Sequence, residues 1–293
     1  MIRRSYRLGV DVGGSHITGA LFDSATCNRV QDRVTRVVIH THGEPDVILA
    51  EFAQVIKQVA GEHLNDVSTI GFAFPGPFDY DEGICLIPPE LAKYEKLFGV
   101  NIRTELTQRL GFRGTMNFMN DAACFAIGEY RMGGARGSQR TLALAIGTGF
   151  GSTFLADGRP VTHGDRVPRD GMLWHVPYKG GIADDTFSSR GLATAWKART
   201  GETINGAKEL DDLARVGDPR AFAIFEQWGN QMAECLNPWL LSFDADTIVL
   251  GGNIAKAWDW FVPALKRGIG GKVRVNPAEL GESAQMIGAA LIG

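Results

Sequence analysis

The amino-acid sequence predicts an α/β protein with two lobes. Short apolar runs typical of strands alternate with amphipathic runs typical of helices along the 293 residues, which is the pattern of sheets covered by helices. Two segments, beginning at Leu8 and Thr141, share the same order of strand, glycine turn and strand. We therefore expect an internally duplicated architecture with one copy in each lobe. Because no low-complexity linker separates the copies, we also expect the lobes to share a cleft.

The composition is that of a folded globular chain. Apolar residues make up 44% and charged residues 22%, and the net charge is -3, which argues against disorder and against sequence-independent nucleic-acid binding. We expect no transmembrane helix, because no apolar run approaches ~18 residues. We expect no signal peptide, because the basic start of the chain lacks an apolar segment. The four scattered cysteines favour reduced thiols in the cytoplasm.

Glycine is frequent: 37 of the 293 residues are glycine, about 13%, against an average of about 7% in proteins. The first cluster of glycines lies between two predicted strands. The predicted strands are residues 8–12 and 17–22, and the turn between them is residues 13–16, where glycine permits positive φ or close backbone approach. Backbone N–H groups gathered in such a turn bind anions. Asp11 would place a carboxylate beside the anion, where it would hold Mg²⁺ directly or through water.

A second glycine cluster, residues 147–151, lies between predicted strands at residues 141–146 and 152–155. Its spacing is GxGxG and a strand follows it, so it is not a dinucleotide-binding fingerprint, and the chain also lacks the Walker motif. Two such turns facing each other would hold the phosphates of a nucleotide. The alternative is that both are tight turns imposed by the geometry of the chain.

Helices are predicted between the strands. Residues 47–60 have apolar side chains on one face, and Gly61 ends this helix. Asp218 and Pro219 begin a long helix that Pro238 bends or ends.

A third glycine turn, residues 251–253, follows a predicted buried strand at residues 247–250 and opens a helix. Here the backbone would approach a flat adenine or ribose closely, although an ordinary helix entry is the alternative.

Asn120 and Asp121 lie between a predicted strand at residues 115–119 and a helix at residues 122–132. Aspartate before a helix is a preferred N-cap, so capping is one explanation for Asp121. The functional explanation is a general base that accepts the proton of a substrate hydroxyl during its attack on a γ-phosphate. The Pro-Gly-Pro turn around Gly76 is either a rigid loop or a place where the backbone approaches a polyol.

Taken in order, these motifs resemble the ROK family of sugar kinases. The segments that carry the resemblance span nearly the whole chain: Asp11-Val12-Gly13-Gly14-Ser15, Pro75-Gly76-Pro77-Phe78-Asp79, Asn120-Asp121-Ala122, Gly147-Thr148-Gly149-Phe150-Gly151, Leu250-Gly251-Gly252-Asn253 and residues 281–290. The resemblance implies a two-lobed, actin-like ATPase (ribonuclease H-like) fold with an interlobe cleft, and a last helix that returns to the N-terminal lobe. Residues 1–119 with 281–293 would form that lobe, and residues 120–280 the C-terminal lobe.

The resemblance also implies ATP- and Mg²⁺-dependent phosphorylation of a hexose at its 6-hydroxyl by a homodimer, with Asp121 as the catalytic base. The residues expected to bind the sugar are Gly76, Pro77, Asn120, Asp121, His175 and Asp184. The residues expected to bind the nucleotide, with Asp11 also on Mg²⁺, are Asp11, Gly13, Gly14, Ser15, His16, Gly147, Thr148, Gly149, Gly151, Gly251, Gly252 and Asn253. Because His16 stands where the family often has lysine, phosphate contact would rely more on the backbone.

The chain departs from the family at its sugar and zinc motifs. The motif at residues 171–175 keeps the histidine, His175, but Met172 stands where a carboxylate usually holds sugar hydroxyls. No cysteine follows, so we expect no structural zinc site, and His175 would lose the metal that fixes its tautomer. Asp184 falls where the family places a second sugar-binding glutamate, with Asp185 as the alternative.

Two other functions are alternatives. A sugar-sensing ROK regulator carries a DNA-binding domain, and because the first glycine motif begins by residue 9, we expect no helix-turn-helix before it. An actin- or Hsp70-like ATPase would use the nucleotide as a switch and would hydrolyse ATP without sugar. The sequence identifies neither the hexose nor the donor, which is ATP or polyphosphate.

Overall fold

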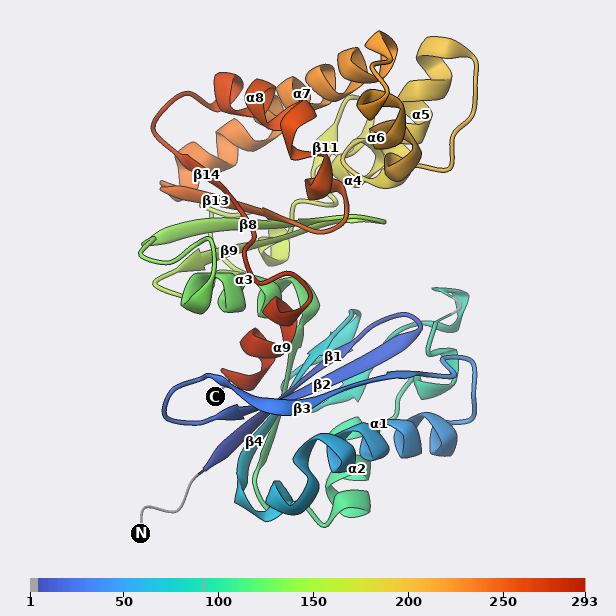
Figure 1. Cartoon of the computed structure of the whole chain (residues 1–293), viewed down its shortest axis with the longest axis vertical. Coiled ribbons are helices and arrows are strands. Elements are labelled where there is room, and N and C mark those ends of the chain that lie inside the picture. The colour runs from blue at the N-terminus through green and yellow to red at the C-terminus, as the bar shows by residue number, and fades with distance from the viewer. Residues whose placement is uncertain (1–4, 92, 293) are drawn as a thin grey trace. The chain divides into compact units, whose positions relative to one another are not determined.

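The computed structural model describes residues 5–91 and 93–292, which divide into two compact units (Figure 1). Unit 1 comprises Met1–Gly128 and Glu282–Gly293, and unit 2 comprises Glu129–Gly281. One boundary therefore falls inside helix α3 (Asp121–Met132), whereas the sequence placed the two boundaries at residues 119/120 and 280/281. Within the described ranges, no helix is long and apolar enough to span a membrane.

Unit 1 is built on a five-stranded sheet with the strand order β3-β2-β1-β4-β7. Its strands are β1 (Tyr6–Val12), β2 (His16–Asp23), β3 (Arg29–Val38), β4 (Val67–Phe74) and β7 (Thr115–Asn120). The strands β1, β2 and β3 pair antiparallel, while β4 is parallel to both β1 and β7. Because β1, β4 and β7 are parallel, the residues that follow them gather at one edge of the sheet.

Helices α1 (Pro45–Ala60) and α2 (Ile102–Leu110) lie on one face of this sheet, and α9 (Ser283–Ala290) lies on the other (Figure 1). α9 packs closely against the sheet at Gly9 and Gly71, which have no side chain. A Cβ on Gly9 would lie 1.9 Å, and one on Gly71 1.8 Å, from a carbonyl oxygen of α9. The prediction that the last helix returns to the N-terminal part of the chain is thus confirmed. The short elements of unit 1 are η1 (Gly61–Asp66), β5 (Phe78–Asp79), β6 (Ile84–Cys85), η2 (Pro89–Leu91) and η3 (Glu95–Leu97).

Unit 2 is built on a second five-stranded sheet, with the order β10-β9-β8-β13-β14. Its strands are β8 (Arg140–Ile146), β9 (Phe150–Ala156), β10 (Arg159–Pro160), β13 (Thr247–Gly251) and β14 (Arg274–Pro277). The strands β8, β9 and β10 pair antiparallel, while β13 is parallel to both β8 and β14. The order and directions match those of unit 1, which confirms the predicted duplication at the level of topology.

The long helices of unit 2 are α5 (Ser189–Thr200), α6 (Ala207–Arg215), α7 (Pro219–Phe243) and α8 (Trp258–Ile269). Pro219 is the first residue of α7 and Asp218 caps it, as predicted. Pro238 lies inside α7, which continues to Phe243, so of the two predicted effects the helix end does not occur at this proline. The short elements are η4 (Arg169–Gly171), β11 (Pro177–Tyr178), β12 (Gly181–Ile182), α4 (Ala183–Thr186) and η5 (Ile254–Ala257).

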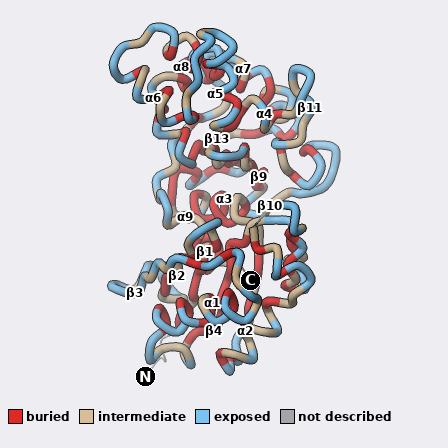
Figure 2. Tube along the Cα trace, turned by 90° about the vertical axis from the view of Figure 1, so that its right-hand side faces the viewer, coloured by how far each residue is buried: buried red, intermediate tan, exposed pale blue. Residues whose placement is uncertain are grey.

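Each unit has its own apolar core. Buried residues concentrate in the strands and along the inner faces of the helices (Figure 2). In unit 1 the core includes Phe52 of α1 and Phe72 of β4, and in unit 2 it includes Phe154 of β9 and Phe225 of α7. Two separate cores make each sheet a rigid base for the turns at its edge.

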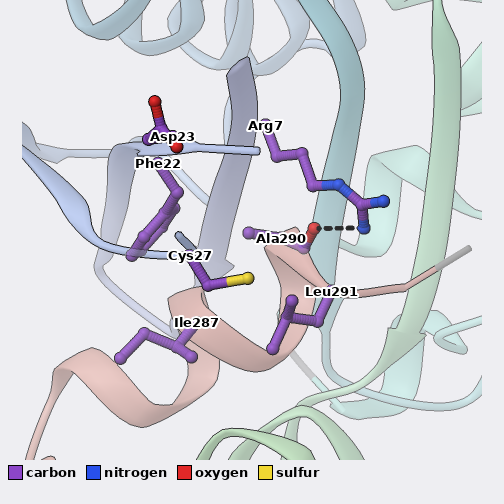
Figure 3. Close-up of a pocket in the computed structure, with 7 residues that line it drawn as sticks. All are labelled: Arg7, Phe22, Asp23, Cys27, Ile287, Ala290 and Leu291. Carbon is purple, nitrogen blue, oxygen red and sulfur yellow. Dashed lines mark hydrogen bonds between the residues drawn. The ribbon is translucent and has the colours of Figure 1, made fainter. Parts of the chain in front are cut away.

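A small cavity lies in unit 1 between the first hairpin and α9 (Figure 3). It is lined in part by Phe22, Cys27 and Leu291, and Arg7 donates across it to the carbonyl of Ala290 at 3.4 Å. Its volume is about 10 Å³, which is at the lower limit for a single water molecule. The cavity is therefore a packing gap under α9 and not a ligand site.

Candidate active site

The first glycine turn joins β1 to β2 at the edge where β4 and β7 also end. Inside it, the N–H of Gly13 donates to the carbonyl of His16 at 2.8 Å. A Cβ on Gly13 would lie 3.0 Å from that oxygen, and neither Gly13 nor Gly14 has positive φ. Close backbone approach therefore selects glycine at residue 13. Ser15 Oγ and His16 Nδ1 form a hydrogen bond of 2.8 Å on the exposed side of the turn.

Asp11 is the next-to-last residue of β1 and points its carboxyl into a crowded, negatively charged region. Burial raises the pKa of this carboxyl to about 7, and the charges of Asp121 and Glu282 act in the same direction, against those of Arg36 and Lys93. A divalent cation would relieve this excess of negative charge. The carboxylate donors fit Mg²⁺, which keeps several waters and needs only one or two carboxylates from the protein. In residues 5–91 and 93–292, no three His, Cys, Asp or Glu side chains group as a metal site.

Asp121 is the first residue of α3, but the cap of this helix is Asn120. The side-chain oxygen of Asn120 accepts the N–H groups of Ala122 at 3.0 Å and Ala123 at 3.4 Å, which are the contacts of an N-cap. Asp121 Oδ1 also accepts the N–H of Ala122, at 2.9 Å. Burial raises the pKa of the Asp121 carboxyl, while this N–H group and Lys93 oppose the rise. Helix capping therefore does not by itself explain the presence of Asp121, since Asn120 already caps α3.

The loop after β4 carries Gly76 and Pro77, both exposed, and a tyrosine links it to the end of β7. Tyr80 Oη donates to the carbonyl of Phe74 at 3.1 Å and accepts a hydrogen bond from Asn120 Nδ2 at 3.3 Å. A Cβ on Gly76 would lie 3.3 Å from the same hydroxyl. Tyr80 thus holds the predicted sugar-binding residues of unit 1 together.

Lys93 and Tyr94 also belong to this edge of unit 1, although the sequence analysis did not identify them. Tyr94 is fully buried, and its hydroxyl donates to the carbonyl of Gly13. Lys93 lies beside the turn, close to Gly14. No local pattern marks these two residues, because they precede a short 3-10 helix in an irregular stretch between strands.

The second glycine turn joins β8 to β9 in unit 2. Gly147 N–H donates to the carbonyl of Gly149 at 3.0 Å, and the carbonyl of Gly147 accepts the N–H of Ser189 at 2.9 Å. The N–H of Phe150 donates to Asp184 Oδ1 at 2.7 Å. The turn is therefore held from outside by α4 and the start of α5.

The third glycine turn lies beside the second. Gly252 has a φ of +86°, and a Cβ there would lie 2.3 Å from the carbonyl oxygen of Ile146, so both the conformation and the close approach require glycine. Asn253 Oδ1 accepts a hydrogen bond of 2.9 Å from Lys256. Next to these turns is a cavity of about 530 Å³, a volume typical of small-molecule sites. Its lining includes Gly147, Thr148, Ser189, Asn205, Asn253 and Ile254.

His175 lies in the same part of unit 2 as the second turn. Its Nε2 lies 3.0 Å from the carbonyl oxygen of Arg169, and since a carbonyl only accepts, Nε2 carries a proton. In the neutral ring this assigns Nδ1 as the acceptor, so a backbone carbonyl fixes the tautomer where the sequence analysis expected it to be unfixed. The carbonyl of Trp174 accepts the N–H of Asp184 at 3.0 Å, which brings the two predicted sugar-binding residues of unit 2 together.

The two candidate carboxylates at the start of α4 have different partners. Asp184, whose side chain is 19% exposed, binds Phe150 N–H and accepts from Arg190 at 3.0 Å. Asp185, at 54% exposed, binds the N–H of Ile182 at 3.1 Å and also contacts Arg190. Asp184 is the one that supports the glycine turn, while Asp185 is more accessible to solvent.

Comparison with known proteins gives one consistent family. The ROK family model matches residues 7–293. The glucokinase of Thermotoga maritima is 27% identical, over 97% of this chain and 96% of its own length. The ROK hexokinase from Thermus thermophilus superimposes with a TM-score of 0.79 at 25% identity, covering 98% of this chain and 97% of that one.

A third similar protein supports the fold alone. The ROK family glucokinase from Streptomyces griseus, solved in complex with glucose and AMPPNP, has a TM-score of 0.73 at 22% identity and covers 98% of each chain. Together with the duplicated sheets, these likenesses identify the fold as the actin-like ATPase fold.

Proposed function

The chain belongs to the ROK family and is a sugar kinase at the level of that family, and we propose that it transfers the γ-phosphoryl group of ATP to the 6-hydroxyl of a hexose with Asp121 as general base. The similar glucokinase and hexokinase support the reaction class. The observation that carries the assignment of the base is that Asn120 caps α3, which leaves the half-buried Asp121 carboxylate beside it for another role.

The proposed step is a direct transfer. The 6-hydroxyl oxygen attacks the γ-phosphorus, its proton passes to Asp121, and the bond from the γ-phosphorus to the bridging oxygen breaks with its electron pair leaving on ADP. Burial raises the pKa of Asp121, which makes it a stronger base than an exposed aspartate. Water would compete for the same phosphoryl group, so closure around the sugar favours transfer over hydrolysis.

We propose that the phosphates bind to the backbone of the glycine turns at residues 13–16 and 147–151, and that His16 contributes through its backbone. Mg²⁺ held at Asp11, directly or through water, would neutralise charge on the phosphates. The adenosine would occupy the cavity of about 530 Å³, which Asn253 lines, and Gly251 and Gly252 precede that residue in the third glycine turn. This cavity favours ATP over polyphosphate as the donor, because a polyphosphate has no base to place there.

The sugar is proposed to lie against the loop of Gly76 and Pro77, with Asn120, His175 and a carboxylate of α4 on its hydroxyls. The Nδ1 atom of His175 is the ring nitrogen left to accept from a sugar hydroxyl, since Nε2 donates to Arg169. Asp184 remains the proposed carboxylate because it lies next to the second turn, and Asp185 is the alternative. Glucose or a related hexose is the proposed acceptor, and each lost hydroxyl contact would discriminate strongly between sugars.

The test is coupled ADP release with a panel of hexoses, with ATP and polyphosphate compared as donors. Asp121→Asn keeps the shape of the side chain and removes the base, so we expect turnover to fall by about 10²–10⁴-fold while sugar binding persists. Asp165→Asn, at an exposed aspartate in a loop of unit 2, is the matched control and should keep wild-type turnover.

Each contrary result has a distinct meaning. Sugar-stimulated turnover that survives in Asp121→Asn would remove this residue from the role of base. ATP hydrolysis that no sugar stimulates would favour a nucleotide-switch ATPase. Sugar binding without any turnover in the wild-type protein would favour a sugar-sensing regulator.

A further inference from the structure

We propose that Lys93 is the cation that binds the γ-phosphate of ATP in this enzyme. The end of its side chain lies beside Gly14 of the first glycine turn, within electrostatic reach of the carboxylates of Asp11 and Asp121. This inference rests on the proposed function and adds to it a catalytic residue that no motif of the sequence marks.

The end of the Lys93 side chain lies beside Gly14, in the space that a side chain at residue 14 would contact. A Cβ built on Gly14 would lie 3.5 Å from Cε and 3.7 Å from Nζ of Lys93. Gly14 is exposed, so an anion that approaches the backbone of this turn meets the ammonium group at the same place. Backbone N–H groups and a lysine ammonium are the usual partners of a phosphate.

The position of Lys93 is fixed by the residue that follows it. Tyr94 is fully buried, packs edge-on against Phe52, and donates its hydroxyl hydrogen to the carbonyl of Gly13. The N–H of Tyr94 donates to the carbonyl of Thr41 at 3.2 Å. Lys93 Nζ lies 5.8 Å from the centre of the Tyr94 ring. The lysine is therefore attached to the turn through its neighbour, which reduces the entropy lost when it binds an anion.

The electrostatic surroundings leave this ammonium available. Lys93 is half-buried, and in the described part of the chain it forms no hydrogen bond and no ion pair within 4.0 Å. Arg36, the other cation that acts on Asp11, is bound to Glu282 at 2.9 Å. A buried charge is normally paired. An ammonium that is half-buried and still without a close partner fits a site whose anion arrives with the substrate.

The proposed role of Lys93 follows from the place where negative charge develops on the transferred phosphoryl group. When the bond between the γ-phosphorus and ADP breaks, charge is spread over the three equatorial oxygens of the transferred group, and a fixed cation stabilises that state. In this role Lys93 acts as a fixed charge and not as the proton acceptor, since the hydroxyl proton passes to Asp121. The ammonium also neutralises part of the repulsion between the phosphate and the two carboxylates.

The experiment compares Lys93→Met, Lys93→Arg and Lys96→Met in the full-length protein. Lys96 is the matched control, because it lies in the same stretch, is exposed, and pairs with the exposed Glu44. For each protein we would measure kcat and KM for ATP and sugar, and the dissociation constants of ADP and of a non-hydrolysable ATP analogue by calorimetry. Circular dichroism would confirm that each variant is folded.

We expect Lys93→Met to lower kcat/KM for ATP by about 10²–10³-fold, the effect of removing one preorganised donor. The ATP analogue should bind roughly tenfold more weakly or worse, while ADP, which lacks the γ-phosphate, should bind within about twofold of wild type. Lys93→Arg should recover part of the loss, and Lys96→Met should match the wild-type protein.

Equal losses for the analogue and ADP, or no loss for either, would overturn the assignment of Lys93. That result is distinct from failure of the proposed function, which would appear as absent sugar phosphorylation by the wild-type enzyme. The binding measurements decide the role of Lys93 even in that case, because they require no turnover.

Discussion

The two sheets share one topology, yet the same position in each carries a different residue. Asp11 in β1 lies between Thr18 of the antiparallel neighbour and Ala73 of the parallel one. In β8 the corresponding residue is Ala145, which lies between Gly151 and Gly251. A carboxylate thus stands beside the first glycine turn and a methyl group stands beside the second.

The residues that contact the two glycine turns also differ, with a charged side chain at the first turn and an open cavity at the second. Tyr94 and Lys93 contact the first turn, and the lysine brings a positive charge to it. Asp184 and the N–H of Ser189 hold the second turn, next to the cavity of about 530 Å³. Under the proposed function, the duplicated framework would divide the work: unit 1 would supply the ionised groups for phosphoryl transfer, and unit 2 the space for the nucleoside.

The largest expected effect comes from exchanging the residues at this shared position. Asp11→Ala should lower kcat by about 10²–10³-fold, because a carboxylate that binds Mg²⁺ contributes several kcal/mol to the transition state. The double variant Asp11→Ala/Ala145→Asp should remain inactive, since the new carboxylate belongs to the other unit and to the wrong turn. Coupled ADP release, titrated with Mg²⁺, measures both.

Asp165→Ala serves as the control for loss of one negative charge and should retain wild-type turnover. Recovery of the double variant to within about tenfold of wild type would show that the two positions are interchangeable, and the division of work between the units would then be wrong.

The fold was largely predictable because its signals are local. Strand–glycine–strand segments set both hairpins, and the proline and aspartate at the start of α7 mark that helix correctly. The boundary inside α3 was not predictable, because a continuous helix gives no break in the pattern where one compact unit ends and the next begins. The sequence could not say whether Pro238 bends or ends α7, because a proline is a local helix breaker and only the packing of the folded chain decides whether the helix continues past it.

The candidate site was predictable only where its residues lie in glycine turns or at helix starts. The sequence located Asn120 and Asp121 but offered the capping role for Asp121, whereas in the structure Asn120 makes the N-cap contacts with Ala122 and Ala123. Tyr80 and Lys93 were missed because their contacts with Asn120 and Gly14 join segments far apart in the chain. Neither residue belongs to a periodic or glycine-rich pattern, so only the folded backbone brings them to the site.

A second comparison concerns buried carboxylates. Glu129 is fully buried in unit 2, and its two oxygens accept three backbone N–H groups, from Gly134 at 2.8 Å, Glu279 at 3.0 Å and Leu280 at 3.0 Å. Asp121 in unit 1 accepts the N–H of its neighbour, Ala122. The first carboxylate is satisfied by the protein, which indicates a structural role, while the second is less fully satisfied.

Glu129→Gln should therefore lower the free energy of unfolding of unit 2 by about 1–3 kcal/mol, because the new NH₂ group faces N–H donors. Asp121→Asn should lower it little or not at all. All six tryptophans, at positions 174, 196, 228, 239, 258 and 260, lie in unit 2. Urea unfolding followed by tryptophan fluorescence therefore reports on that unit, and unfolding followed by circular dichroism reports on both units, including the one that contains Asp121.

The control for Glu129 is Glu226→Gln, at an exposed glutamate of α7 whose partner is Arg267, and it should change the stability by less than about 0.5 kcal/mol. If Glu129→Gln unfolded at the wild-type urea concentration, or if Asp121→Asn lost as much stability as Glu129→Gln, the contrast between structural and functional carboxylates would not hold.

The smallest effect is a pH dependence of stability that belongs to unit 1. The pKa of Asp11 is about 7 in the folded protein and 3.8 without its surroundings, so between these values the folded state binds more protons than the unfolded state. Its contribution to stability is therefore lost as pH rises from about 4 to about 7 in the metal-free protein. The raised pKa of Asp121 acts in the same direction.

Carboxyls with lowered pKa values, such as Asp246 and Glu95, stabilise in the opposite sense, so the total profile does not isolate Asp11. The difference in stability between wild type and Asp11→Asn isolates the contribution of Asp11, because the other carboxyls are common to both proteins. We expect the melting temperature of Asp11→Asn relative to wild type to rise by roughly 2–4 °C per pH unit between about pH 4.5 and pH 7, measured by calorimetry in a chelating buffer. Added Mg²⁺ at pH 7.5 should stabilise wild type more than the variant, since it binds the ionised carboxylate. A constant difference across this range would mean that Asp11 titrates as an ordinary aspartate, and the charge asymmetry between the two turns would lose its energetic basis.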